Sequence, residues 1–124
     1  MQHKKQGSKV WYIPDGFIPA QSSGNLESHE AICILNCNAE VAESIVTVYF
    51  EDRDPIENIQ VRTNGKRTNH IRTDGLQFEG QKIPKGIPYA LRVESNIPII
   101  VQFSRMDATQ AENTLMTTMA FPEQ

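Results

Sequence analysis

Short apolar runs, divided by prolines and glycines at close intervals, are the feature that most limits the fold of this chain. The 124 residues include seven prolines and seven glycines. The runs between them, such as Ile45–Phe50 and Ile99–Phe103, are rich in β-branched and aromatic residues. This spacing is typical of antiparallel strands joined by tight turns, and a helical periodicity is nearly absent. The sequence therefore predicts an all-β protein.

About eight strands are expected in a single domain over residues 10–122, after a flexible N-terminal extension of residues 1–9. Asn64-Gly65 is the strongest hairpin signal, and Pro14-Asp15-Gly16 and Asn96-Ile97-Pro98 predict turns. A capping pattern at Asp107 predicts a turn or two of helix at most. The fold class is an antiparallel, jelly-roll-like β-sandwich with little helix. The expected strands are Val10–Ile13, Glu30–Asn36, Glu43–Glu51, Ile59–Thr63, Arg67–Arg72, Tyr89–Ser95, Ile99–Ser104 and Leu115–Phe121.

Composition and charge narrow the class of protein. Hydrophobic residues make up 39% and charged residues 22%, which is an ordinary globular balance. The net charge of -3 gives no reason to expect general nucleic-acid affinity, because that needs a basic face. No apolar run approaches the roughly 20 residues that cross a bilayer, and no secretory signal precedes the domain, so a cytoplasmic location is expected. Cys33 and Cys37 would lie about 13 Å apart in one strand, so we expect buried thiols without a disulfide or a metal.

Compact charged clusters lie at the ends of the predicted strands. Ser28-His29-Glu30 precedes one strand, while Glu51-Asp52-Arg53-Asp54 and Arg105-Met106-Asp107 follow two others. Neighbouring strands of a sandwich end at a common rim, so the pattern predicts a polar binding site there. The candidate ligand-binding residues are Trp11, His29, Glu30, Arg53, His70, Arg72, Arg105 and Asp107.

The two histidine-bearing segments each allow two interpretations. His70 and Arg72 share one strand face, which is either solvated surface or one wall of a cleft for an anion or a hydroxylated ligand. His29 is either a satisfied histidine at a strand end or a hydrogen-bonding group near His70. In an extended strand His29 and Glu30 point to opposite sides, so they cannot both line one pocket unless the strand contains a bulge.

The remaining candidates are equally open at this point. Arg53 lies in a run of charged residues that is either a plain turn with local ion pairs or part of a binding site. In a binding site, its planar guanidinium would bind carboxylate, phosphate or vicinal hydroxyls. Asp107 shares strand parity with Arg105, and it either caps the short helix or joins the site. Trp11 is either a core residue or a platform for a sugar ring. An enzyme is not expected, because no nucleophile motif and no facing pair of carboxylates can be recognised.

A set of segments follows one another in a characteristic order from Val10 to Phe121. They are Trp11–Pro19, Ser28–Glu30, Val48–Arg53, Lys66–Arg72, Val93–Gln102, Arg105, Asp107, Gln110–Asn113 and Thr117–Ala120. Taken together, these segments resemble the sensory rhodopsin transducer family. The resemblance implies a small soluble β-sandwich that assembles as a homotetramer and associates with the cytoplasmic side of a seven-helix retinal photoreceptor. It also implies sugars or similar small ligands for related domains, and DNA for the transducer.

The leading hypothesis is a non-enzymatic, cytoplasmic signal transducer that works by binding and needs no cofactor. Its charged strand ends would bind a partner or a small polar or anionic ligand, and a homo-oligomer, a tetramer by the resemblance, would relay the change. The alternatives are a carbohydrate-binding module without any photoreceptor and, with weaker support, a DNA-associated regulator. The apolar segment Leu115–Phe121 is expected to pack in a core or a subunit interface.

Overall fold

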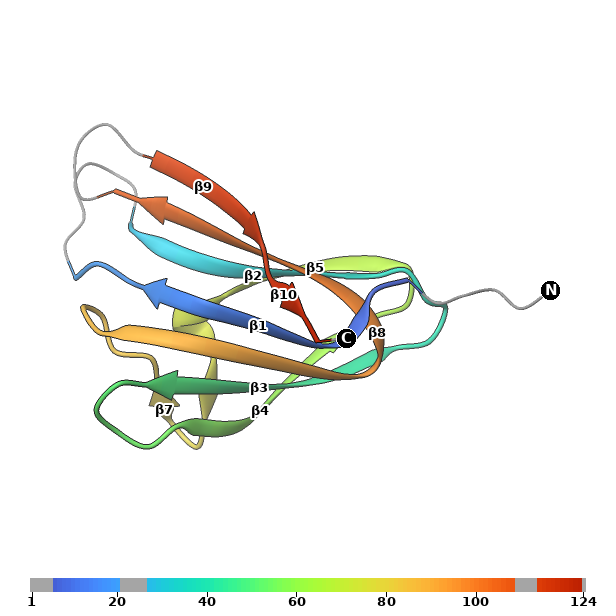
Figure 1. Cartoon of the computed structure of the whole chain (residues 1–124), viewed down its shortest axis with the longest axis horizontal. Helices are drawn as coiled ribbons and strands as arrows, with labels where there is room; N and C mark the ends of the chain where they lie inside the picture. Colours follow the sequence, from blue (N-terminus) through green and yellow to red (C-terminus); the bar gives the residue numbers. More distant parts are fainter. Residues whose placement is uncertain (1–5, 21–26, 109–113, 124) are drawn as a thin grey trace.

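The computed structural model describes residues 6–20, 27–108 and 114–123, and they form a sandwich of antiparallel strands (Figure 1). Every strand pairing is antiparallel. The predicted all-β, antiparallel sandwich with about eight strands and little helix is confirmed. The elements are β1 (Ser8–Phe17), β2 (His29–Asn36), β3 (Ala42–Phe50), β4 (Ile56–Thr63), β5 (Arg67–Arg72), the 3-10 turn η1 (Thr73–Gly75), β6 (Gln77–Phe78), β7 (Gln81–Lys82), β8 (Pro88–Asp107), β9 (Thr114–Met119) and β10 (Phe121–Pro122).

The long strand β8 belongs to both layers of the sandwich. Its first half pairs with β1 and β3, and its second half pairs with β2 and β9. One layer therefore has the order β10-β1-β8-β3-β4, and the other has the order β9-β8-β2-β5. The turn predicted at Asn96-Ile97-Pro98 is wrong, because the backbone stays extended there while β8 passes from one layer to the other.

Alternate residues of the central strands fill the core between the layers. Ile32, Ile34, Val93 and Val101 are fully buried, and their neighbours in sequence are more exposed. Trp11 is 5% exposed, and its indole N–H lies 2.9 Å from the carbonyl oxygens of both Ser8 and Ile99. The structural interpretation of Trp11 is therefore correct, and a sugar platform at this position is wrong, because the ring has no face open to a ligand.

The Asn64-Gly65 turn does not close a hairpin. It leads from β4 in one layer to β5 in the other, and those two strands do not pair with each other. The Asn36 side chain donates to the carbonyl oxygen of Thr63 at 3.1 Å, which ties the turn to the end of β2. A Cβ added to Gly65 would lie 2.0 Å from the carbonyl oxygen of Ala39. Close packing against the β2–β3 connection, and not strand pairing, is what requires glycine here.

Pro14-Asp15-Gly16 also differs from its prediction, because it lies inside β1. The register with β8 shifts between Ile13 and Gly16, so the segment is a β-bulge and not a turn. A Cβ added to Gly16 would lie 2.5 Å from the ring of Tyr89. The glycine therefore allows the tyrosine ring to lie directly against β1.

Two further predictions differ from the structure. Ser8 and Lys9, predicted to belong to the N-terminal extension, begin β1. The cysteines are free thiols, but neither is buried: Cys33 is partly exposed and Cys37 is exposed.

Some predictions fall on residues that the structure does not describe. These are residues 1–5 of the extension and the helix predicted after Asp107, over residues 109–113, whereas Asp107 itself is the last residue of β8. Within the described ranges, no helix is long and apolar enough to cross a membrane.

Candidate functional site

A buried carboxylate, Glu30, lies at the start of β2 and is completely hidden from solvent. Its Oε1 accepts hydrogen bonds from the hydroxyl of Tyr89 and, at 2.9 Å, from the backbone N–H of Phe17. Its Oε2 accepts from Nε of Arg105. A carboxylate can be kept ionised in a protein interior when it is paired and hydrogen-bonded in this way. We call Glu30, Tyr89, Thr73 and Arg105 the Glu30 cluster.

Tyr89 and Thr73 complete the cluster on the side opposite to Arg105. The Tyr89 hydroxyl lies 2.9 Å from Oγ1 of Thr73, which in turn donates to the backbone carbonyl oxygen of Glu30 at 3.3 Å. Burial raises the pKa of Tyr89 above its ordinary value, and the hydrogen bond to Glu30 and its negative charge raise the pKa further. Tyr89 therefore stays protonated and acts as a hydrogen-bond donor to the carboxylate.

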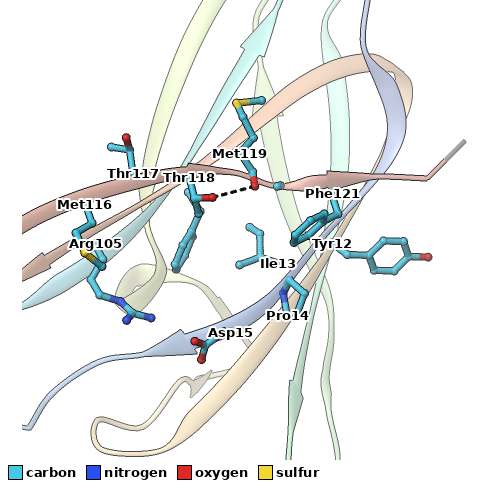
Figure 2. A pocket seen from close by; sticks show the side chains of 12 residues that line it. Tyr12, Ile13, Pro14, Asp15, Arg105, Met116, Thr117, Thr118, Met119 and Phe121 are labelled. Carbon is cyan, nitrogen blue, oxygen red and sulfur yellow. Dashed lines mark hydrogen bonds between the residues drawn. The ribbon is translucent and has the colours of Figure 1, made fainter.

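Arg105 connects this buried cluster to a pocket at the edge of the sandwich. Its side chain is 28% exposed and lines a cavity of about 410 Å³. The cavity lies between β1 on one side and β9 and β10 on the other. Figure 2 shows Arg105 and Asp15 toward one end of it, and Tyr12 and Phe121 toward the other. Its residues are Tyr12, Ile13, Pro14, Asp15, Phe103, Arg105, Met116, Thr117, Thr118, Met119, Ala120 and Phe121.

The sequence matches the family described as the Anabaena sensory rhodopsin transducer over residues 6–122. The chain belongs to this family. A crystal structure of Thermotoga maritima 1070 is similar to it, with 39% identity, a TM-score of 0.84, and coverage of 94% of this chain and 96% of that chain. The Anabaena sensory rhodopsin transducer is also similar, with 34% identity, a TM-score of 0.75, and coverage of 87% and 96%. No curated protein matched the sequence. The resemblance seen in the sequence is thus confirmed.

In this member of the transducer family, the structure brings together two of the predicted site residues, Glu30 and Arg105. They face each other across the β2–β8 pair and point into the sandwich. Asp107 lies two positions beyond Arg105 at the end of β8, opposite Thr114. Of the predicted cluster of charged strand ends, the structure therefore joins these two residues, as an internal ion pair.

His29 and His70 lie on the face of the β9-β8-β2-β5 layer that is turned away from the core, which we call the outer face. His29 occupies the first position of β2, and His70 pairs with Cys33, four positions further along that strand. That separation is about 13 Å, so the two rings do not meet. Nδ1 of His29 lies 2.9 Å from the carbonyl oxygen of Glu27. The interpretation of His29 as a satisfied strand-end histidine is therefore the correct one.

Arg72 also lies on the outer face, and a local carboxylate occupies its guanidinium. Nε and Nη2 of Arg72 donate to the two carboxylate oxygens of Asp74 at 3.0 and 2.7 Å, and Glu27 is 3.9 Å from Nη2. The hydrogen bond to Asp74 raises the pKa of Arg72. The hydrogen bond from Lys85, followed by its charge and that of Arg72, lowers the pKa of Glu27. These groups form an exposed ion-pair network beside the site.

Arg53 lies in the β3–β4 connection, apart from the Glu30 cluster. Its Nε donates to Oδ1 of Asp52 at 3.0 Å, and its guanidinium carbon is 5.5 Å from the centre of the Phe50 ring. The hydrogen bond from Arg53 lowers the pKa of Asp52. The expected turn with local ion pairing is therefore what the structure shows at this charge run.

Tyr89, Thr73 and Asp15 are not among the site residues predicted from the sequence, and neither is most of the apolar lining of the cavity. Tyr89 was assigned only to a strand, although the alternation along β8 already placed it on the buried side with Leu91 and Val93. A buried tyrosine usually needs a hydrogen-bond partner for its hydroxyl, so a tyrosine on the buried side of a strand was the available sign of a polar group nearby. Asp15 was assigned to a turn, so its place beside the cavity could not be anticipated.

Proposed function

We propose that this chain is a non-enzymatic signal transducer of the sensory rhodopsin transducer type, which acts in the cytoplasm by binding a small polar ligand and a protein partner. Arg105 carries the proposal: a guanidinium held by a fully buried carboxylate and open to a cavity, in a chain of this family. Glu30 is the positioning residue, and Arg105 is the residue that contacts the ligand. We also propose that Asp107, which follows Arg105 by two positions on β8, contributes to this site.

The chemistry of the cluster supports binding over turnover. Both carboxylate oxygens of Glu30 already accept hydrogen bonds, so neither is available as a general base. Tyr89 is held protonated by burial and by its contact with Glu30. In the cavity, the hydroxyl of Thr118 makes its hydrogen bond to the carbonyl oxygen of Met119, at 3.4 Å. A nucleophile without a base within hydrogen-bond reach is not activated.

The proposed protein partner is the cytoplasmic face of a membrane photoreceptor, because one of the similar structures bears the name of a sensory rhodopsin transducer. DNA has weaker support as a partner. Four surface arginines, Arg53, Arg62, Arg72 and Arg92, each pair with a carboxylate within 3.0 Å. Binding to a DNA backbone requires cations that can replace condensed counterions, and these pairs offset that charge locally.

Self-association is the second part of the proposal, and the outer face supports it. Leu115 is 66% exposed, Met119 is 50% exposed and Leu35 is 41% exposed, and all three lie on that face, which also carries the half-buried Ile100 and Met106. Apolar surface of this kind marks interaction sites on soluble proteins. We propose that copies of the chain cover it in a homo-oligomer, a tetramer by analogy with the family.

The proposal is tested by flotation with lipid vesicles that carry a seven-helix retinal sensory rhodopsin, compared with empty vesicles. The wild-type chain is expected to float with the receptor vesicles only. Arg105→Gln should weaken that association, whereas Arg62→Gln, which removes a surface ion pair to Glu43, should leave it unchanged. Equal recovery with empty vesicles, or equal loss in the two variants, would contradict the proposal.

A further inference from the structure

The cavity beside Arg105 has a definite chemistry, and we infer that it takes a small zwitterion with an apolar substituent, the chemistry of an apolar α-amino acid. This inference rests on the proposed function and names the class of ligand for the same site. It is carried by three features of the cavity: its size and apolar walls, the free part of the Arg105 guanidinium, and the carboxylate of Asp15.

The size and walls of the cavity fit the apolar part of such a ligand. Its volume of about 410 Å³ lies toward the lower end of the 300–1,000 Å³ typical of small-molecule sites. Ile13 and Phe103 form a buried floor, while Met116 is 54% exposed and Phe121 is 62% exposed. Methionine side chains adapt to irregular apolar groups. An apolar substituent placed here removes these side chains from water, so the walls select for it.

Arg105 provides the site for a carboxylate. Nε of Arg105 is committed to Glu30, which fixes the plane of the guanidinium. Within the part of the chain that the structure describes, the two terminal nitrogens, Nη1 and Nη2, have no hydrogen-bond partner. Met116 on β9 lies directly opposite Arg105 on β8, so an apolar wall begins beside these nitrogens. A planar guanidinium with free N–H groups beside an apolar wall matches a carboxylate that carries an apolar chain.

The charges around the cavity favour a zwitterion over a simple anion. Glu30 already neutralises Arg105, and Asp15 adds a second carboxylate at the same end of the cavity (Figure 2). Among the described residues, Arg105 forms an ion pair with Glu30 and none with Asp15. A monoanion would therefore enter a site with a net negative charge. A ligand with an ammonium group next to its carboxylate can pair with both Asp15 and Arg105, and it adds no net charge to the site.

Isothermal titration calorimetry with three matched probes tests this inference on the full chain. The probes are L-leucine, 4-methylpentanoate, which lacks the ammonium group, and 3-methylbutylamine, which lacks the carboxylate. We expect L-leucine to bind at least tenfold more tightly than either analogue. In Asp15→Asn the advantage of leucine over 4-methylpentanoate should fall by at least threefold, while Asp54→Asn, an exposed carboxylate elsewhere, should keep it. In Arg105→Gln, leucine binding should be lost.

The outcomes separate this inference from the proposed function. If leucine and a panel of other apolar amino acids give no heat at 10 mM, or if the analogues or glucose bind as tightly as leucine, the zwitterion inference is wrong. Asp15→Asn keeps the test valid if Arg105→Gln fails to fold, because Asp15 is exposed and outside the Glu30 cluster. Flotation with receptor vesicles is measured without amino acids, so the transducer proposal can survive a negative titration. The transducer proposal can also fail in the flotation experiment even if the titration shows that leucine binds.

Discussion

Replacing Glu30 with glutamine removes one negative charge from the interior and leaves the size of the side chain nearly unchanged. The glutamine oxygen can still accept from Phe17 N–H and the Tyr89 hydroxyl, as Oε1 of the carboxylate does. The glutamine nitrogen then faces Nε of Arg105, so two donors meet where a charge-assisted hydrogen bond stood. The variant therefore isolates the ion pair from the rest of the packing.

The magnitude follows from burial. Breaking a fully buried ion pair costs about 3–5 kcal/mol, and losing a hydrogen bond to a charged group costs about 1.5–3 kcal/mol. Glu30 is fully buried, but the Arg105 side chain is 28% exposed and can be partly rehydrated. The expected loss is therefore about 2–3 kcal/mol in the free energy of unfolding at pH 7. For a chain of this length, that corresponds to a fall in Tm of roughly 10 °C.

Urea unfolding followed by tryptophan fluorescence measures this loss, because Trp11 is the only tryptophan and lies in the core. Glu43→Gln is the matched control: Glu43 pairs with Arg62 at 2.7 Å, but on the surface. Such a pair contributes about 0–1 kcal/mol. A Glu30→Gln variant within about 0.5 kcal/mol of the wild type would refute the account of the cluster, because surface changes have effects of that size.

Three further predictions concern Tyr89, its glycine neighbour and the outer face. The pKa of Tyr89 is raised in the folded protein, so the tyrosine loses its proton at a lower pH in the unfolded chain than in the folded one. The free energy of unfolding should therefore fall by up to about 1.4 kcal/mol per pH unit above about pH 10. Tyr89→Phe should lack this part of the decline in urea titrations, and identical pH profiles of the two proteins would contradict the prediction. Gly16→Ala should lower the free energy of unfolding by about 1–3 kcal/mol, because the added methyl group crowds the Tyr89 ring. Gly75→Ala, with open space around the glycine, should change Tm little. Equal melting curves for the two variants would be inconsistent with the bulge geometry. Met119→Glu should reduce the oligomer mass measured by light scattering, and an unchanged mass would exclude the outer face as the interface.

Most of the strands could be predicted because alternation and composition are local. The prediction for β5 is correct at both ends. The predicted range for β2 differs from the structure by one residue at its start, and that for β3 differs by one residue at each end. The predicted hairpin at Asn64-Gly65 failed because a turn signal does not show which layer the next strand joins. Hydrogen bonds from Asn36, at the end of the distant strand β2, hold the turn in place, and no local pattern reveals them.

The site was predicted in part for a related reason. Strand ends and side-chain alternation placed Glu30 and Arg105 at one rim, and they separated His29 from Glu30 correctly. Their contact with each other depends on the pairing of β2 with the second half of β8, seventy-five residues away. Tyr89 belongs to the first half of the same strand, and it reaches the Glu30 cluster because β8 crosses between the layers. The crossing could not be read from Asn96-Ile97-Pro98, which has the composition of a turn.

The central claim is that buried Glu30 fixes the guanidinium of Arg105 at the cavity, and NMR of the arginine Nε–H groups tests it most directly. In a ¹H–¹⁵N spectrum, assigned by its absence from Arg105→Gln, the Arg105 Nε–H should be shifted downfield and exchange slowly with water. The account predicts that Glu30→Gln removes both properties without changing the backbone amide spectrum beyond the cluster. An Arg105 Nε–H that exchanges as fast in the wild type as that of exposed Arg67 would contradict it.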